Sequence, residues 1–138
     1  MTRRRPLVLL ALVGALAGFA AAIAEAGPPG RVVVAGGALT EIAFALGAGA
    51  RIVGVDTTST WPPEAEDLPD IGYFRRLSAE GVLSLAPDLL LAAPETGPEI
   101  ALDQIAAAGV EIRTAPDMPG AAGIGPRIHF VGEALGRE

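Results

Sequence analysis

The chain alternates short apolar runs with segments of helical character from residue 31 onward. Four runs rich in branched residues are typical of strands: RVVVA at 31–35, which is expected to be buried, RIVGV at 51–55, DLLLAA at 88–93 and VEIRTA at 110–115. Strands that alternate with helices in this way form parallel sheets. The pattern therefore predicts an α/β fold, a single Rossmann-like lobe with a parallel sheet of about four strands flanked by helices.

Capping residues set the expected helix boundaries. Thr40 is expected to cap the helix after the first strand, and Ser78 is expected to cap a short helix before the third. Pro98 suits the first turn of another helix. The final segment, residues 127–138, is expected to open a helix, and no capping signal is found at its end.

A long loop is predicted between the second strand and the Ser78 helix. The stretch DTTSTWPPEAEDLPDIGYFRR, residues 56–76, carries three prolines and has neither a helical nor an alternating period. Loops of this length in compact domains are usually functional or disordered. We therefore look for candidate binding residues in this segment.

The first residues have the pattern of a secretory leader. A basic start, RRR, is followed by an apolar run and then by small residues at alternate positions, with cleavage expected after Ala24 or Ala26. A membrane anchor is the alternative, because residues 6–24 are mostly apolar. The small residues at the end of the apolar run are typical of a cleavage site and favour cleavage over an anchor. The sequence therefore predicts that residues 1–24 are a signal peptide and that residues 25–138 are an exported domain.

Composition narrows the class of protein. The formal net charge is −6 and all ten basic residues are arginines scattered along the chain, so no nucleic-acid partner is expected. Cysteine is absent, so neither a disulfide framework nor a lipid-bearing thiol at the leader junction is available. Together with the secretory leader, the absence of a cysteine that could carry a lipid predicts a periplasmic protein without a lipid anchor.

The sequence lacks the signatures of common enzymes. It contains no G-x-S-x-G, no Walker loop and no H-E-x-x-H, and Gly36–Gly37 lacks the third glycine of a dinucleotide-binding loop. His129 is the only histidine and is expected at the surface or half-buried. An enzyme built on Ser78 and His129 has only the residue types in its favour, so we expect a protein that is not an enzyme.

Tyr73, the only tyrosine, lies between Gly72 and two arginines in the stretch GYFRR. A phenol has an unperturbed pKa of about 10, so nearby positive charge is needed to favour the phenolate at neutral pH. In an extended segment Arg75 would share a face with Tyr73 and supply that charge. A phenolate suits ferric iron, and Arg75 could alternatively hold a haem propionate. The competing interpretation is a surface tyrosine beside solvated arginines.

Trp61 and Glu80 also have two interpretations each. Trp61 precedes two prolines in the long loop and could form an aromatic pocket wall or simply anchor the loop onto the core. Glu80 falls in the first turn of the Ser78 helix, where a carboxylate gains roughly 0.3–1 kcal/mol from the helix dipole. That gain alone is enough to account for Glu80.

The stretch from residue 32 to residue 92 resembles the N-terminal lobe of haem-binding periplasmic proteins of bacterial ABC importers. These belong to a wider class of binding proteins for cobalamin, siderophores and haem. The most specific element is G-Y-x-R-x-L-S-A-E-G, met at residues 72–81, whereas GGALTEI and PDLLLA are shared across the wider class. The resemblance covers roughly residues 31–138.

The resemblance implies roles for individual residues. Tyr73 corresponds to the tyrosine that coordinates the haem iron, and Arg75 to an arginine close to the haem. Trp61 or Phe74 would pack on the porphyrin edge. Glu80 corresponds to the glutamate with which the N-terminal lobe docks onto arginines of the membrane permease.

Members of this family have two lobes joined by a long helix, and the ligand lies between the lobes. Residues 25–138 correspond to the first lobe and to the start of that helix, so we expect the second lobe to come from another chain or to be missing from a truncated product. The resemblance implies periplasmic capture of haem, as hemin, and its delivery to an ABC-type importer. The alternatives are binding of a ferric siderophore or cobalamin on the same scaffold, and a truncated remnant without transport activity.

Overall fold

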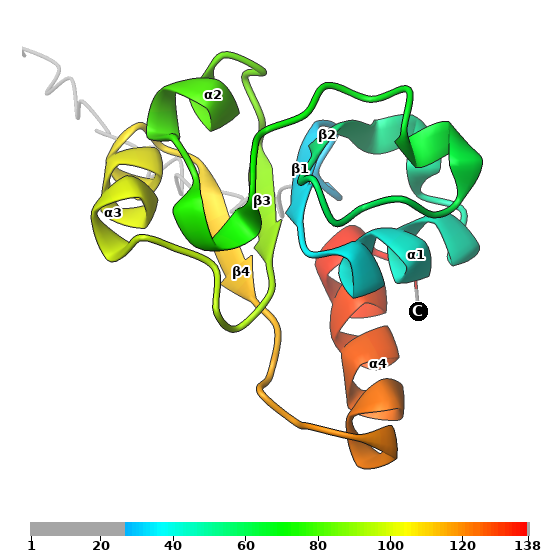
Figure 1. Ribbon diagram of the computed structural model, residues 1–138. Coiled ribbons are helices and arrows are strands. Elements are labelled where there is room, and N and C mark those ends of the chain that lie inside the picture. The colour runs from blue at the N-terminus through cyan, green and yellow to red at the C-terminus, as the bar shows by residue number, and fades with distance from the viewer. Residues whose placement is uncertain (1–26, 138) are drawn as a thin grey trace, which may run out of the picture.

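The computed structural model describes residues 27–137, which form a parallel sheet between two layers of helices (Figure 1). The predicted signal peptide and both of its candidate cleavage positions lie outside the described residues. None of the helices in the described part of the chain is long and apolar enough to cross a membrane.

The sheet has four strands, and all of its pairings are parallel. They are β1 (Val32–Ala35), β2 (Ile52–Val55), β3 (Leu89–Ala92) and β4 (Glu111–Thr114), in the order β2-β1-β3-β4. Each strand falls within one of the four apolar runs, so the predicted α/β fold with about four parallel strands is confirmed.

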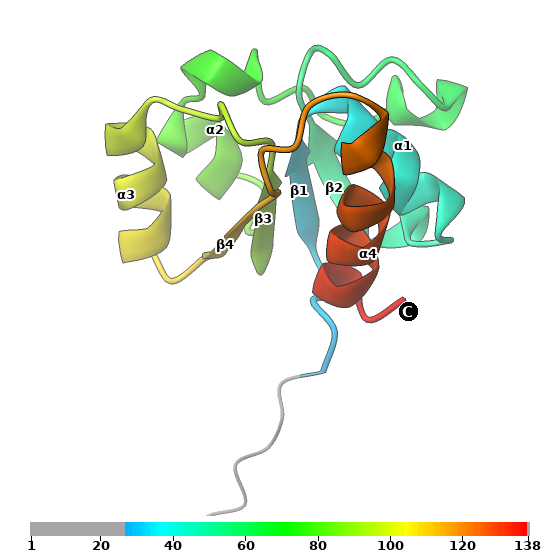
Figure 2. The same ribbon diagram turned by 90° about the horizontal axis from the view of Figure 1, so that it is seen from below.

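Four α-helices cover the two faces of the sheet in pairs. Figure 2 shows α1 (Gly37–Ala45) and α4 (Ile124–Leu135) on one side of the sheet, and α2 (Ala79–Leu83) and α3 (Glu99–Ala107) on the other. The members of each pair also contact one another. The sheet is therefore covered on both faces, as parallel sheets require.

The central strand β1 contributes to two separate cores. Val32 and Val34 pack in the core beneath α1 and α4, whereas Val33 and Ala35 pack in the core beneath α2 and α3. Successive side chains of a strand point to opposite faces. This double burial explains why the strand reads as an unbroken apolar run in the sequence.

The order of the strands places a topological switch between β1 and β3. The chain leaves β1 toward α1 on one face of the sheet and leaves β3 toward α3 on the other. In open α/β sheets of this kind a crevice opens where neighbouring strands send their connections in opposite directions. The carboxyl ends of β1 and β3 are therefore the place to look for a site.

The helix boundaries agree with the sequence in one place and differ in another. Ser78 is the N-cap of α2, and its Oγ accepts a hydrogen bond from the amide of Gly81 at 3.3 Å. Thr40, in contrast, is not a cap, because α1 begins three residues earlier at Gly37. Gly36 has a φ of 129°, which lets the chain turn directly from β1 into the helix.

The end of α4 also differs from the prediction. The helix stops at Leu135, and Gly136 follows with a φ of 60° in the left-handed region. A glycine in this conformation is a common helix C-terminal signal, because it has no Cβ to clash. The expectation that no capping signal ends this helix is therefore wrong.

The long loop, residues 56–76, is irregular as predicted and contains two 3₁₀ turns, Pro63–Ala65 and Phe74–Arg76. A buried carboxylate fixes its beginning. Asp56, 2% exposed, accepts hydrogen bonds at Oδ1 from the Gly36 amide and the Ser59 hydroxyl, both at 2.9 Å. Its Oδ2 accepts from the amide and the hydroxyl of Thr58, at 3.1 and 2.8 Å.

This set of hydrogen bonds, which we call the Asp56 clamp, joins the turn after β1 to the loop after β2. The Thr58 hydroxyl also accepts a hydrogen bond from the Gly37 amide at 3.0 Å, and the Ser59 hydroxyl lies 2.7 Å from the Thr40 hydroxyl. A buried carboxylate is tolerated where its lone pairs are satisfied. The clamp therefore holds two of the loops that border the switch point.

We expect Asp56→Ala to lower the free energy of unfolding by about 3 kcal/mol, because buried donors lose a charged acceptor. Denaturant unfolding followed by circular dichroism measures the change. Asp67→Ala, at an exposed position of the same loop, is the control and should leave stability almost unchanged. Equal stabilities of the two variants would contradict the role assigned to the clamp.

Gly37→Ala should lower the free energy of unfolding by about 1–3 kcal/mol through overpacking. A Cβ at this position would collide with the carbonyl oxygen of Thr58, which is backbone and cannot rotate away. Gly125→Ala in α4 is the matched control, since a Cβ there meets nothing within 4 Å. The prediction fails if both alanine variants melt at the temperature of the parent protein.

Candidate functional site

Loops from all four strands meet at the carboxyl edge of the sheet and enclose a cavity of about 410 Å³. Its position is the switch point between β1 and β3. Helix α4 adds a further wall. The lining residues are Gly36, Gly37, Ala38, Leu39, Thr58, Phe74, Ala93, Pro94, Glu95, Asp117, Met118, Pro119 and Arg127.

Tyr73 stands next to this cavity on the last part of the long loop. Gly72, with a φ of 87°, turns the chain here, and its carbonyl accepts a hydrogen bond from the Thr57 amide at 3.0 Å. The Tyr73 ring packs edge-on against Phe74, with 4.9 Å between the ring centroids. Phe74 lines the cavity, whereas Tyr73 is 41% exposed and is not itself a lining residue, so the phenol lies at the surface beside Phe74 instead of in the core.

Arg75 lies differently from the expectation. Residues 74–76 form a 3₁₀ turn, so the extended segment that would have aligned Arg75 with Tyr73 is not formed. Arg75 instead pairs with Glu95 at 3.6 Å, and its guanidinium lies 5.4 Å from the centre of the Phe74 ring. No hydrogen bond joins Arg75 to the Tyr73 hydroxyl within residues 27–137. The spacing argument for Arg75 was therefore wrong, although Arg75 does lie close to the cavity.

Trp61 is placed in a different hollow. It lines a depression of about 520 Å³ together with Phe44 of α1 and is 60% exposed. The structure thus brings Tyr73, Phe74 and Arg75 together and leaves Trp61 outside that group. Trp61 therefore forms no wall of the Phe74 cavity, and its side chain is not buried in the core.

Glu80 and His129 lie at the surface. Glu80 is exposed in the first turn of α2, as the sequence predicted. His129 is exposed on α4 and does not line the 410 Å³ cavity. Within residues 27–137 no group of three or more histidine, cysteine, aspartate or glutamate side chains could hold a metal ion.

Four polar or flexible residues of the cavity were missed from the sequence. Glu95, Asp117 and Met118 follow the ends of β3 and β4, and the rule that ligands bind beyond the carboxyl ends of parallel strands could have indicated them. Arg127 had no such signal. It belongs to α4, which reaches the cavity only because the chain folds back over the sheet.

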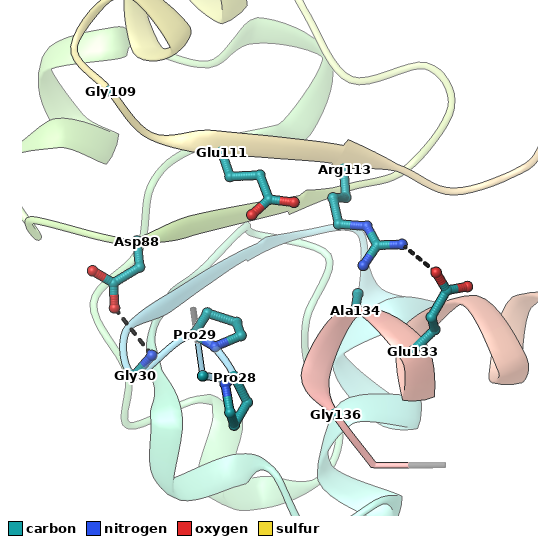
Figure 3. A pocket seen from close by; sticks show the side chains of 11 residues that line it. Pro28, Pro29, Gly30, Asp88, Gly109, Glu111, Arg113, Glu133, Ala134 and Gly136 are labelled. Carbon is teal, nitrogen blue, oxygen red and sulfur yellow. Dashed lines mark hydrogen bonds and ion pairs between the residues drawn. The ribbon is translucent and has the colours of Figure 1, made fainter. Parts of the chain in front are cut away.

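A larger hollow of about 630 Å³ lies at the opposite, amino edge of the sheet (Figure 3). Three of its four charged side chains, all but that of Glu111, are already paired within the protein. Asp88 accepts hydrogen bonds from the amides of Gly30 and Arg31 at 3.0 and 2.8 Å, and Arg113 forms an ion pair with Glu133 at 3.1 Å. Because ligands of open α/β sheets bind at the carboxyl edge, we assign the candidate site to the smaller cavity.

Comparison with known proteins agrees with this architecture. The vitamin B12-binding protein of Pectobacterium carotovorum is 34% identical over 96 residues, which are 66% of this chain and 35% of that protein. An uncharacterised ABC transporter substrate-binding lipoprotein of Bacillus subtilis is 36% identical over 101 residues, 72% of this chain and 32% of that protein.

A solved structure is similar as well. The periplasmic haem-binding protein of Roseiflexus sp. RS-1, in its apo form, matches with a TM-score of 0.74 and 50% identity, over 77% of this chain and 41% of that one. The chain thus spans less than half the length of these proteins. Residues 32–138 match the family described as periplasmic binding protein, and the chain belongs to that family.

Proposed function

We propose that this chain is the N-terminal lobe of a periplasmic binding protein that captures haem for an ABC-type importer, with Tyr73 as an axial ligand of the iron. The observation that carries the proposal is the position of Tyr73. It is a partly exposed phenol, 41% accessible, that packs against Phe74, a residue lining a largely apolar cavity at the switch point of the sheet. The protein would act by binding and would carry out no catalysis.

The set of available donors favours haem over a bare metal ion. Tyr73 is a single oxygen donor, and no metal-binding cluster is found in residues 27–137. A porphyrin supplies the equatorial ligands of its iron itself, so one protein side chain is enough for an axial bond. Tyrosine is an established axial haem ligand.

The surroundings of Tyr73 suit a flat apolar ligand. Phe74 holds the phenol ring from one side, and Leu39, Pro94 and Met118 add apolar surface to the cavity. A porphyrin face would bury this surface, which contributes about 25 cal/mol per Å² of apolar area removed from water. Arg75 would support the site indirectly, because its guanidinium lies over Phe74 and binds Glu95.

A lobe of this kind covers one face of its ligand. Binding sites commonly bury 70–90% or more of a ligand's surface, so a second lobe would complete the site and supply a second axial ligand. This lobe would then supply the face of the site that carries Tyr73.

Cobalamin is the second candidate ligand. The observation in its favour is the 34% identity to a protein described as vitamin B12-binding. Cobalamin carries its own axial base and would use the apolar cavity without a phenolate bond. A ferric siderophore would use the same surface in the same way. Competition between hemin and cyanocobalamin for the protein separates these ligands.

Export and docking complete the proposal. The predicted leader, residues 1–24, would deliver the lobe to the periplasm. Glu80 would then meet an arginine of the permease in the inner membrane, since its carboxylate is exposed in the first turn of α2. In Figure 1 α2 lies at the top of the molecule and the loop between β4 and α4 at the bottom, so docking through α2 would leave the β4–α4 wall of the cavity free.

Tyr73→Phe should abolish the tyrosinate-to-iron charge-transfer band, shift the Soret band of bound hemin, and weaken hemin binding by at least about tenfold, or about 1.4 kcal/mol. The variant keeps the aromatic ring and its packing on Phe74 while removing the oxygen donor. Absorption titration with hemin of the protein purified from the periplasm measures both changes.

His129→Ala is the control for adventitious ligation by the only imidazole. It should leave the spectrum and affinity of the hemin complex unchanged, because His129 is exposed on α4 away from the cavity. A Tyr73→Phe complex indistinguishable from the parent complex would rule out ligation by Tyr73. Absence of hemin binding to the parent protein, with tight cyanocobalamin binding, would favour the second candidate.

Glu80→Ala should reduce haem uptake by cells that carry the cognate importer, while hemin affinity in solution stays the same. The carboxylate is removed from the surface without altering the cavity. Glu99→Ala is the matched control, because Glu99 is also an exposed glutamate in the first turn of a helix, α3. Equal uptake with both variants would argue against docking through Glu80.

A further inference from the structure

We propose that Arg127 is the anchor for a carboxylate of the bound ligand, so that the cavity selects ligands that carry an anionic arm. This inference rests on the haem-binding function proposed above and adds the recognition of one ligand group to it. Two arginines are near the candidate site: Arg127 lines the cavity, and Arg75 lies beside the lining residue Glu95.

Arg75 is already engaged within the protein. Its guanidinium pairs with the carboxylate of Glu95 at 3.6 Å and also lies over the Phe74 ring. A ligand carboxylate at Arg75 would have to share the guanidinium with the like-charged carboxylate of Glu95, 3.6 Å away. The propionate role considered for Arg75 from the sequence therefore fits another arginine better.

Arg127 has no carboxylate partner within 4.0 Å among residues 27–137. Its single hydrogen bond runs from Nη2 to the Met118 carbonyl oxygen at 3.4 Å, close to the outer limit for such a bond. A guanidinium has five N–H donors in a planar fork that matches a carboxylate. Most of these donors are free to bind a ligand.

The surroundings of Arg127 strengthen such a contact. The side chain is half-buried and lines the cavity beside Leu39, Met118 and Pro119. Charge-assisted hydrogen bonds are stronger where apolar neighbours exclude water. Asp117 also lines the cavity, but it is exposed to solvent and lies beyond ion-pair distance of Arg127.

Arg127 and Tyr73 come from opposite faces of the sheet, which suits a ligand with a metal centre at one place and a carboxylate at another. Phe74, which holds Tyr73, packs against the core beneath α2 and α3, whereas Arg127 belongs to α4 on the other face. Both line the same cavity. A porphyrin bound through its iron at Tyr73 would extend across the switch point and bring a propionate on its edge toward α4.

The test compares hemin with hemin dimethyl ester, which has the same iron and ring but no carboxylate. The full chain is expressed and the protein purified from the periplasm, as the parent and as Arg127→Gln, Arg127→Lys and Arg137→Gln. Arg137 is the control, because it is exposed beyond the end of α4 and donates to the Gly47 carbonyl at 3.3 Å.

We expect Arg127→Gln to weaken hemin binding by about tenfold or more and to change binding of the ester by less than about twofold, because only hemin offers the carboxylate. Arg127→Lys should retain part of the preference for hemin, since it keeps the charge but not the fork. Arg137→Gln should bind both porphyrins as the parent does.

Three results would overturn the inference. If the parent binds hemin and its ester equally, or if Arg127→Gln weakens both to the same extent, Arg127 contacts no carboxylate and the Tyr73 proposal stands alone. If the parent binds neither porphyrin, the haem-binding function and the anchor fall together. Circular dichroism of each variant shows that any loss arises in a folded protein.

Discussion

The position of the candidate site depends on one buried carboxylate. Asp56 follows β2, and its two oxygens together accept four hydrogen bonds from the turn after β1 and from its own loop. The sheet alone would fix the strands but would leave the loops beyond their carboxyl ends free to separate. The Asp56 clamp ties the turn after β1 to the loop after β2 by hydrogen bonds. The walls of the cavity that these two loops form are therefore held in place by the strands.

The cavity combines two kinds of surface that come from opposite faces of the sheet. The long loop brings an aromatic pair, Tyr73 and Phe74, from the side of α2 and α3, and α4 brings Arg127 from the side of α1. This division follows from the order of the strands, because the connections leaving β1 and β3 diverge at the switch point. A ligand held here contacts both helical layers at once.

The fold could be predicted from the sequence because strands and helix caps are marked by residues that are close together in the chain. Each apolar run became a strand, fully buried in β1 and β3 and partly exposed in the edge strand β4, and Ser78 capped its helix through a contact three residues away. Thr40 and Arg75 were misplaced because a glycine φ and a 3₁₀ turn changed the local geometry. Arg127 could not be found at all, since its place depends on how α4 packs over the sheet. Prediction thus succeeded where the apolar pattern or a capping side chain decides, and failed where an unusual backbone turn or tertiary packing does.

The segment ahead of β1 has a practical consequence for work on this protein. Gly27–Gly30 lie in the hollow at the amino edge of the sheet, and Arg51 links the Pro29 carbonyl to that of Leu135 at 3.1 and 2.6 Å. Gly27, the first described residue, therefore lies at the edge of the sheet opposite the cavity. A purification tag or an immobilising linker attached there would keep the ligand entrance unobstructed on a sensor surface.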